Sequence, residues 1–270
     1  MPLQIAKPNS TFNCKAYFLL KENMAASAFN SKSHQHTRSN SLPTRTHPFI
    51  SEFNDQLSRL RDLEATSSSS ASICQKLNGL QDLHDCVDKL LLLPFTQALA
   101  QEQCEKLVNE MLDGSLRLLD ICDMARDALL QTKECTHELQ STLHRRPGNK
   151  MEISGEVEKY LASRKGVKKE MKKLQSKSSS WSLVSKLVHH KRVACECEET
   201  DANEFEMVDE ALQYLISHKP SKSDYSLVID NVQNWLGKLE LNIQDLEEVL
   251  ECLSRTIVKT RVSLLNILYH

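Results

Sequence analysis

Residues 231–270 read NVQNWLGKLELNIQDLEEVLECLSRTIVKTRVSLLNILYH. Steps of four and three residues, taken in turn, reach ten aliphatic residues and one threonine: Val232, Leu236, Leu239, Ile243, Leu246, Leu250, Leu253, Ile257, Thr260, Leu264 and Ile267. No glycine or proline follows Gly237. The stretch therefore predicts one long amphipathic helix whose apolar seam must be buried against other helices.

Two arrangements would bury this seam: a bundle within one chain, or a coiled coil between two chains. Three upstream segments, Phe53–Leu63, Leu77–Leu91 and Leu116–Leu130, carry apolar residues at helical spacing and need a central element to pack against. The sequence therefore favours an all-α bundle of long amphipathic helices in a monomer over a coiled-coil dimer.

The composition agrees with a helical protein. The 270 residues include only six glycines, seven prolines and 5% aromatic residues, which is typical of helices rather than sheets. A formal net charge of -2 argues against a wholly basic nucleic-acid binder, so no nucleic-acid partner is expected. Most of the nine cysteines stand singly within helical patterns, which indicates free thiols in a reducing compartment.

The compartment is expected to be the cytoplasm, with the plastid or a peripheral membrane location as alternatives. The N-terminus lacks the apolar core and cleavage site of a secretory signal. No apolar run approaches the roughly 20 residues that cross a bilayer. However, residues 1–47 are basic, rich in hydroxyl groups and poor in acids, which is also typical of a plastid transit peptide.

Local signals place the boundaries of the upstream helices. Pro48 is expected to start the first helix, and Ser72 to cap the second. Pro94 is expected to end the second helix and to open a third, while Asp113 and Gly114 mark a turn or a kink. Further helices are predicted over residues 152–176 and 203–218.

Two apolar stripes compete for the buried face of the segment that follows Gly114. One consists of Leu116, Leu119, Met124, Leu129 and Leu130, and the other, tighter one of Leu118, Cys122, Ala125 and Leu129. The small residues of the second stripe would let the C-terminal helix approach closely. Residues 145–149, RRPGN, form the clearest internal linker and are interpreted as a division between an N-terminal and a C-terminal helical layer.

Residues 1–47 are interpreted as a disordered tail, of which residues 1–23 form an optional extension or a targeting segment. The sharpest motif in the chain lies in this tail. Arg38 stands three residues before Ser41 and Pro43 two residues after it, with Ser39 between. A basophilic kinase recognises arginine at this spacing, and 14-3-3 proteins bind Arg-Ser-x-Ser-x-Pro once the second serine is phosphorylated. The alternative is a tail serine that is never modified.

A basic block and an acidic block follow one another in the second half of the chain. Residues 159–192 hold eleven Lys or Arg against one acid, and residues 196–210 hold eight acids and no base. An anionic surface, either a membrane or a nucleic acid, could bind the lysines, among them Lys165, Lys168, Lys169, Lys172 and Lys173. Internal neutralisation and a solvated helix face are the alternatives. Residues 177–203 are interpreted as a charged, partly disordered connection within a helical domain of residues 48–270.

No arrangement of residues typical of catalysis is recognisable. The six glycines are scattered, so no glycine-rich loop is available for a phosphate group. Cys195 and Cys197 have the wrong spacing for a zinc site, although His189 and His190 lie nearby. We therefore expect no catalytic residue, no bound cofactor and no metal site, and we interpret the protein as a non-enzyme.

Four blocks of sequence carry a family resemblance. They are HTRSNSLPTRTHP at residues 36–48, LLLLPFTQ at 90–97, DGSLRLLD at 113–120 with ARD at 125–127, and RVSLLNIL at 261–268. On these blocks the chain from Met24 onward resembles the plant-specific BYPASS-like family. Residues 1–23 and the acidic segment at 196–210 depart from the family's pattern.

The resemblance implies an all-helical plant protein that has no catalytic residues. It also implies a role in root and shoot development, through control of a mobile signal from the root. Together with the tail motif, it favours a non-enzymatic regulatory protein whose partner is a 14-3-3 protein. A peripheral membrane protein bound through the basic block is the alternative, and an uncharacterised enzyme is a second one.

Overall fold

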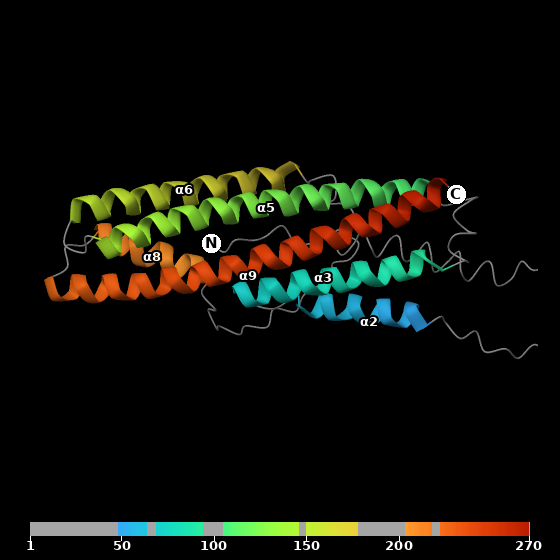
Figure 1. Cartoon of the computed structure of the whole chain (residues 1–270), viewed down its shortest axis with the longest axis horizontal. Coiled ribbons are helices and arrows are strands. Elements are labelled where there is room, and N and C mark those ends of the chain that lie inside the picture. The colour runs from blue at the N-terminus through green and yellow to red at the C-terminus, as the bar shows by residue number, and fades with distance from the viewer. Residues whose placement is uncertain are drawn as a thin grey trace, which may run out of the picture. The chain divides into compact units, whose positions relative to one another are not determined.

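The computed structural model describes residues 48–63, 69–93, 105–145, 150–177, 203–217 and 222–269. Six helices make up nearly all of these residues, and the described ranges contain no strand (Figure 1). The helices are α2 (Pro48–Leu63), α3 (Ser70–Leu91), α5 (Glu105–Arg145), α6 (Lys150–Lys177), α8 (Glu204–Ser217) and α9 (Lys222–Tyr269). The prediction of an all-α protein is confirmed.

The described residues form two compact units. The first unit contains the start of α3 up to Leu77, α5 from Ile121, all of α6 and α8, and α9 up to Glu251. The second unit contains α2, α3 from Asn78, α5 up to Asp120, and α9 from Cys252. The linker at residues 145–149 does not separate them, because the helices on both of its sides belong to the first unit. The interpretation as two layers divided there is wrong.

The seam of α9 is buried within a single chain. Ten of its eleven residues are buried, and Ile267 is half-buried. The positions from Val232 to Leu250 belong to the core of the first unit, and those from Leu253 to Leu264 to the core of the second. The seam is therefore packed against other helices of the same chain, as the bundle interpretation requires. The preference for a monomer stays a prediction.

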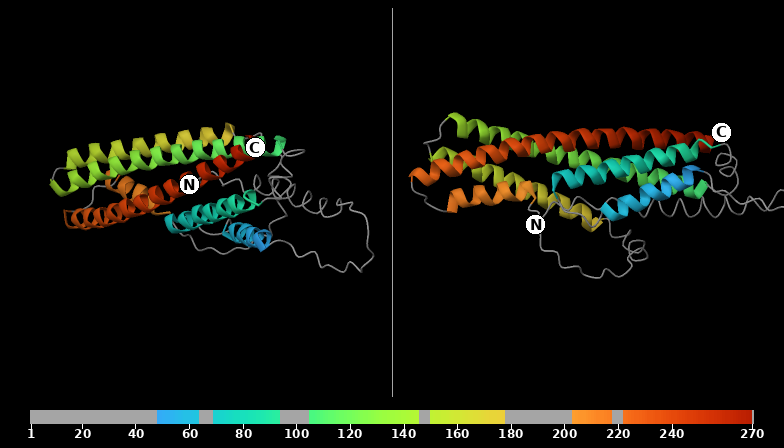
Figure 2. Two further views of the ribbon diagram at one scale, coloured as in Figure 1. Left: turned by 45° about the vertical axis from the view of Figure 1, so that its right-hand side comes forward. Right: turned by 90° about the horizontal axis from the view of Figure 1, so that it is seen from below.

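In the first unit, α6 lies along the C-terminal part of α5 (Figures 1 and 2). Of the two proposed stripes on α5, the second is the more buried: Cys122 and Ala125 are buried, and Leu118 and Leu129 are half-buried, whereas Leu116 and Leu130 of the first stripe are about half exposed. Thr132 and Thr136 continue the buried stripe, and their hydroxyls donate to the carbonyls of Ala128 and Thr132 at 2.7 and 2.8 Å. Back-bonding of this kind satisfies a buried hydroxyl within its own helix.

In the second unit, α2 packs antiparallel to α3 (Figure 2). Lys89 Nζ lies 2.8 Å from Glu52 Oε1, and a Cβ on Gly79 would stand 3.2 Å from the Leu60 side chain. Gly79 thus permits a close approach of α2. The predicted start of α2 at Pro48 is confirmed. However, α3 begins at Ser70 rather than after Ser72, because the Ser69 hydroxyl accepts the hydrogen bond from the Ser72 amide and caps the helix.

Asp113 and Gly114 do not form a turn, since α5 continues through them. A glycine within a helix costs only about 1 kcal/mol, and contacts with α9 stabilise this position. Arg261 donates to the carbonyl of Leu112 and, at 2.8 Å, to the hydroxyl of Ser115. Two of the blocks that carry the family resemblance are thereby hydrogen-bonded to each other within the second unit.

An ion pair with a buried carboxylate joins α3 and α9 in the same unit. The Asp88 carboxylate is 4% exposed, and it accepts hydrogen bonds from Lys259 Nζ at 2.9 Å and from the Ser263 hydroxyl at 2.5 Å. Lys259 itself is largely exposed. Because Ser263 belongs to the C-terminal block, residues 261–268, this block has a structural role.

His84 makes the stability of the protein sensitive to acid. It is buried on α3, and burial lowers its pKa from 6.5 to about 4. The unfolded chain therefore binds a proton near pH 6.5 while the folded chain does not, so stability is lost as the pH falls from about 6.5 towards 4.

We expect the decrease in unfolding free energy between pH 7 and pH 4 to be smaller by about 2–3 kcal/mol in a His84→Leu variant. Urea denaturation of both proteins across this pH range measures the difference. Parallel pH profiles of the two proteins would contradict this prediction, because they would show that the His84 imidazole has the same pKa in the folded and the unfolded chain.

Candidate functional site

Arg164 on α6 is the most unusual buried residue of the first unit. It lies on the same face of α6 as Tyr160 and Val167, at helical spacing, and its side chain is only 3% exposed. The guanidinium carbon lies 4.8 Å from the centre of the Phe205 ring on α8, in the geometry of a cation–π contact. A guanidinium is charged at all physiological pH values, so this position holds a permanent positive charge inside the protein.

Asp209, one turn after Phe205 on α8, supplies the opposite charge. Its Oδ1 lies 3.4 Å from Arg164 Nε, and its Oδ2 lies 2.8 Å from Lys168 Nζ. The carboxylate is 15% exposed, and the Lys168 side chain is 33% exposed. Two cations from α6 therefore share one carboxylate, and the shorter contact belongs to the lysine.

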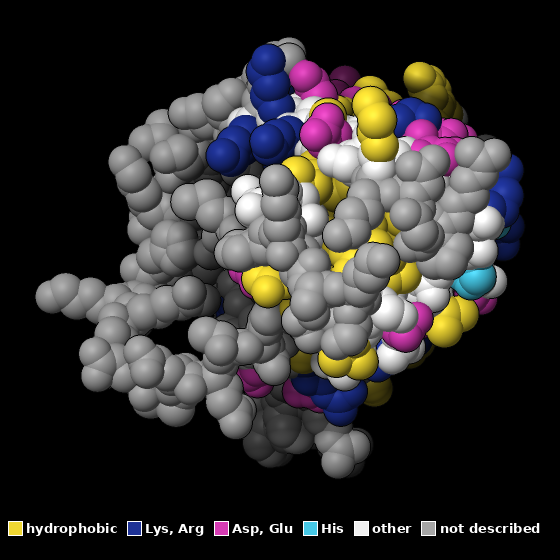
Figure 3. Space-filling view, turned by 90° about the vertical axis from the view of Figure 1, so that its left-hand side faces the viewer, with side chains coloured by type: hydrophobic (Ala, Val, Ile, Leu, Met, Phe, Trp, Pro, Cys, Tyr) yellow, Lys and Arg dark blue, Asp and Glu magenta, His cyan; other side chains and the backbone are white. Residues whose placement is uncertain are grey.

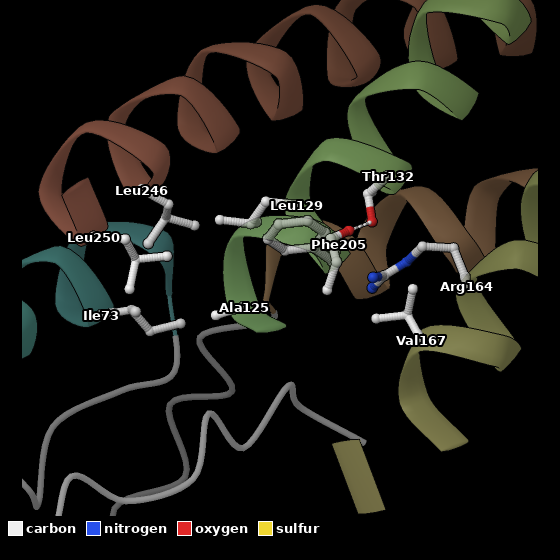
Figure 4. A pocket seen from close by; sticks show the side chains of 10 residues that line it. Ile73, Ala125, Leu129, Thr132, Arg164, Val167, Phe205, Leu246 and Leu250 are labelled. Atoms are coloured by element: carbon white, nitrogen blue, oxygen red, sulfur yellow. Dashed lines mark hydrogen bonds between the residues drawn. The ribbon is translucent and has the colours of Figure 1, made fainter. Parts of the chain in front are cut away.

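A small cavity opens beside the Arg164 guanidinium (Figure 4). Its volume is about 30 Å³. All five helices of the first unit contribute to its walls, through Ile73, Ala125, Ala128, Leu129, Thr132, Arg164, Val167, Phe205, Leu246 and Leu250. Apart from Thr132 and Arg164, these residues are hydrophobic. The Thr132 hydroxyl donates to its own helix, and the surface of the cavity is apolar throughout, because Thr132 and Arg164 expose only carbon atoms to it.

The guanidinium has an unused donor. Arg164 Nη2 is buried and has no hydrogen-bond partner among the described residues. Figure 4 shows the guanidinium lying between Phe205 and Val167 on the side of the cavity. A buried polar group without a partner costs free energy, and such a group is expected to be satisfied by a water molecule or a ligand.

Two helix N-termini meet in the first unit and fix the position of α8. Asn203 caps α8, because its side-chain oxygen accepts from the Phe205 amide at 3.0 Å. Glu204 accepts from the amide and the hydroxyl of Ser70, both at 3.0 Å, at the start of α3. A carboxylate at a helix N-terminus interacts favourably with the helix dipole and thereby stabilises the helix. These contacts position Phe205 and Asp209 for Arg164.

In the basic block predicted on α6, some lysines form ion pairs with acids of the chain and others are exposed. Lys168 pairs with Asp209, and Lys159 lies 2.6 Å from Glu138 of α5, so internal neutralisation accounts for these two residues. Lys165, Lys169 and Lys172 are exposed. The side chain of Lys173 lies outside the described residues. Figure 3 shows that on one face of the protein Lys and Arg side chains lie in several groups, some of them beside acidic side chains.

The motif around Arg38, Ser39, Ser41 and Pro43 lies outside the described residues. So do Cys195, Cys197 and the connection over residues 178–202. The phosphorylation motif and the expectation of a disordered tail therefore stay predictions.

Sequence reasoning did not identify Arg164, Phe205 and Asp209 as a unit. Arg164 was counted as one of eleven cations in the basic block, and Asp209 as one of eight acids. A usable signal was present, because Arg164 falls in register with Tyr160 and Val167 on the apolar face of its helix. A cation on a face that is otherwise apolar predicts a buried pair or a binding site.

Within the described ranges, no three His, Cys, Asp or Glu side chains lie close enough together to hold a metal ion. Among the described helices, none has the combination of length and hydropathy that crossing a membrane requires.

A family model described as Protein BPS1 matches residues 76–177 and 171–267, which together make up more than half of the chain. No curated protein matches the chain, and no solved structure does. The matched regions contain Arg164 and Asp209, together with all of the described contacts between α5 and α9.

Proposed function

Because the chain belongs to the Protein BPS1 family, we propose that it is a non-enzymatic regulatory protein of plant growth. It acts by binding another macromolecule, and phosphorylation of its N-terminal tail controls that binding. The resemblance to the BYPASS-like family supports a role in root and shoot development. The observation that carries the proposed control is the placement of Arg38 and Pro43 around Ser41.

The position of the motif suits binding by a 14-3-3 protein. It ends at Pro43, five residues before α2 begins at Pro48, so binding requires none of the described helices to open. The phosphate on Ser41 would enter a pocket lined by arginines, and Pro43 would direct the chain out of the binding groove. Arg38 would serve recognition by the kinase.

We expect the full chain carrying phosphoserine at position 41 to bind a 14-3-3 protein at least tenfold more tightly than the unmodified chain. Pro43→Ala should weaken binding of the phosphorylated protein, and Arg38→Ala should reduce phosphorylation by a basophilic kinase. Isothermal titration calorimetry and a kinase assay measure these effects.

Phosphoserine at position 31 provides the control, because Ser31 has neither arginine three residues before it nor proline two residues after it. The proposal is wrong if the chain phosphorylated at Ser41 binds no better than this control.

A second candidate function is binding to an anionic membrane surface through α6. Lys165, Lys169 and Lys172 are exposed and follow one another at spacings of four and three residues, so they lie on one side of the helix. Within the described residues, no ion pair neutralises them. A lysine near an anionic surface contributes about 1 kcal/mol, so three would raise membrane affinity on the order of 100-fold.

Sedimentation with vesicles of phosphatidylserine and phosphatidylcholine tests this second function. We expect binding that weakens as salt is added, and loss of binding when the three lysines are replaced by glutamate. The control replaces Lys106 and Lys238, which are exposed on α5 and α9, in the same way. Binding that ignores both salt and the α6 charge reversal would rule out this surface.

A further inference from the structure

An apolar stripe is exposed at the end of α9, within the second unit. Its four side chains follow one another at steps of four, three and four residues, so they lie on one side of the helix. They are Val258, Val262, Leu265 and Tyr269, which are 49%, 51%, 37% and 83% exposed. By contrast, the residues three and four positions before and after the exposed Leu241 are polar or glycine. A contiguous exposed apolar surface is typical of a site that binds another molecule.

Leu116 of α5 extends this stripe towards α5. It is 49% exposed and follows directly after Ser115. In the same way, Val262 follows directly after Arg261, which donates to the Ser115 hydroxyl at 2.8 Å. Because α5 and α9 run antiparallel (Figures 1 and 2), the next residue on each helix turns to the same side of this contact. Leu116 and Val262 therefore belong to the same surface.

The edge of this surface on α5 is negatively charged. Asp113 and Asp120 are exposed, three residues before and four residues after Leu116, so they lie on its side of α5. Within the described residues, neither carboxylate has an ion-pair partner. Arg261 donates to a carbonyl and a hydroxyl of α5 rather than to either of them. Both carboxylates are therefore available to a positively charged partner.

The spacing and the charge together select the kind of partner. Apolar residues at steps of three and four match an amphipathic helix, whose own apolar face has the same spacing. The carboxylates of α5 favour lysine or arginine along one edge of that face. The other edge of the stripe carries the exposed Arg255, so a basic row is favoured on the α5 side alone. The carboxylates also disfavour an anionic membrane surface at this place.

We propose that the exposed stripe of α9, together with Leu116, binds an amphipathic helix of another protein that has lysine or arginine along one edge of its apolar face. The interaction uses neither Ser41 nor the exposed lysines of α6. It is therefore independent of the proposed function, and failure of one test leaves the other standing.

Two synthetic helical peptides of about 18 residues, or five turns, are the probes. In the first, leucines recur at steps of three and four, lysines follow one edge, and glutamine fills the remaining positions. The second has glutamate in place of every lysine. Fluorescence anisotropy of each labelled peptide, titrated with the full chain, measures binding. We expect the lysine peptide to bind at least about tenfold more tightly than the glutamate peptide, by a factor that shrinks as salt is added.

Two double variants separate the apolar contribution from the charged one. Val262→Gln/Leu265→Gln removes the centre of the stripe and should lower the affinity for the lysine peptide at least about tenfold. Asp113→Asn/Asp120→Asn keeps the apolar residues, and it should reduce the preference for lysine over glutamate to about twofold or less.

Leu227→Gln/Leu241→Gln is the matched control, because these leucines are 63% and 64% exposed elsewhere on α9. It should bind the lysine peptide as the wild-type chain does. All the replaced residues are exposed, so the variants should fold like the wild-type chain. The proposal is overturned if the two peptides bind the wild-type chain equally, or if neither binds.

Equal losses of affinity in the control and in Val262→Gln/Leu265→Gln would also overturn the proposal. Sedimentation equilibrium of the chain without peptide tests a different occupant. A mass that doubles with concentration, and returns to that of one chain in Val262→Gln/Leu265→Gln, would show that a second copy of the chain covers the stripe, and it would overturn the proposal as well.

Discussion

Replacing Asp209 by alanine is expected to lower the free energy of unfolding by about 3 kcal/mol. The reason is the burial of its partner. The Arg164 side chain is 3% exposed, so it cannot turn to solvent when the carboxylate is lost. Removal of one partner of a buried ion pair typically costs about 3–5 kcal/mol because it leaves an uncompensated charge. The 3.4 Å separation of Nε and Oδ1 places the expected value at the lower end of this range.

Replacing Arg164 by methionine should lower the free energy of unfolding less than replacing Asp209 by alanine. In Arg164→Met, Asp209 keeps Lys168 at 2.8 Å, and both groups have some access to solvent. The double variant Arg164→Met/Asp209→Ala removes the buried charge together with its partner, so we expect it to recover at least half of the stability lost in Asp209→Ala. Urea denaturation of the four proteins provides the complete cycle.

Lys159→Ala is the matched control for this cycle. Lys159 also belongs to α6 and pairs with an acid on another helix, but both side chains are more than half exposed, and such pairs contribute at most about 1 kcal/mol. A cost for Asp209→Ala as small as that for Lys159→Ala would show that the Arg164 guanidinium reaches solvent.

The course of the long helices could be predicted from the sequence because their signals are periodic. The seam from Val232 to Leu264 repeats over nine turns, and every one of its positions is buried. Where the signal was a single residue, tertiary contacts decided the outcome. Asp113 and Gly114 indicated a turn or a kink, but α5 continues through them, and Arg261 binds the helix on either side of Gly114, at Leu112 and Ser115. Propensity is a weak predictor when contacts of this kind oppose it.

The candidate site could not be predicted because its residues are ordinary in sequence. Arg164 and Asp209 are 45 residues apart, and each lies among many residues of the same charge. Only the packing of α6 against α8 shows which cation is buried and which lysines remain exposed. Neutralisation within the chain was one of the alternatives that the two charged blocks left open, and the contacts of Asp209 with Arg164 and Lys168 show it for these three residues.

Leu239→Ala is expected to lower the free energy of unfolding by about 3 kcal/mol, as a test of whether α9 is the centre of the first unit. Leu239 is fully buried, at 0% exposure, and a buried leucine replaced by alanine costs about 2–5 kcal/mol, through lost apolar burial and the cavity that remains. A cost of this size is a large part of the total stability of a typical domain.

Leu241→Ala is the control, because it is the same substitution two residues away on the same helix. Leu241 is 64% exposed, so its replacement should change stability by less than about 0.5 kcal/mol. If the seam were instead buried between two chains, the loss in Leu239→Ala would depend on protein concentration, since dissociation would accompany unfolding. Unfolding curves of both variants at two concentrations a hundredfold apart therefore separate the two arrangements. A midpoint that does not move with concentration places Leu239 in the core of its own chain.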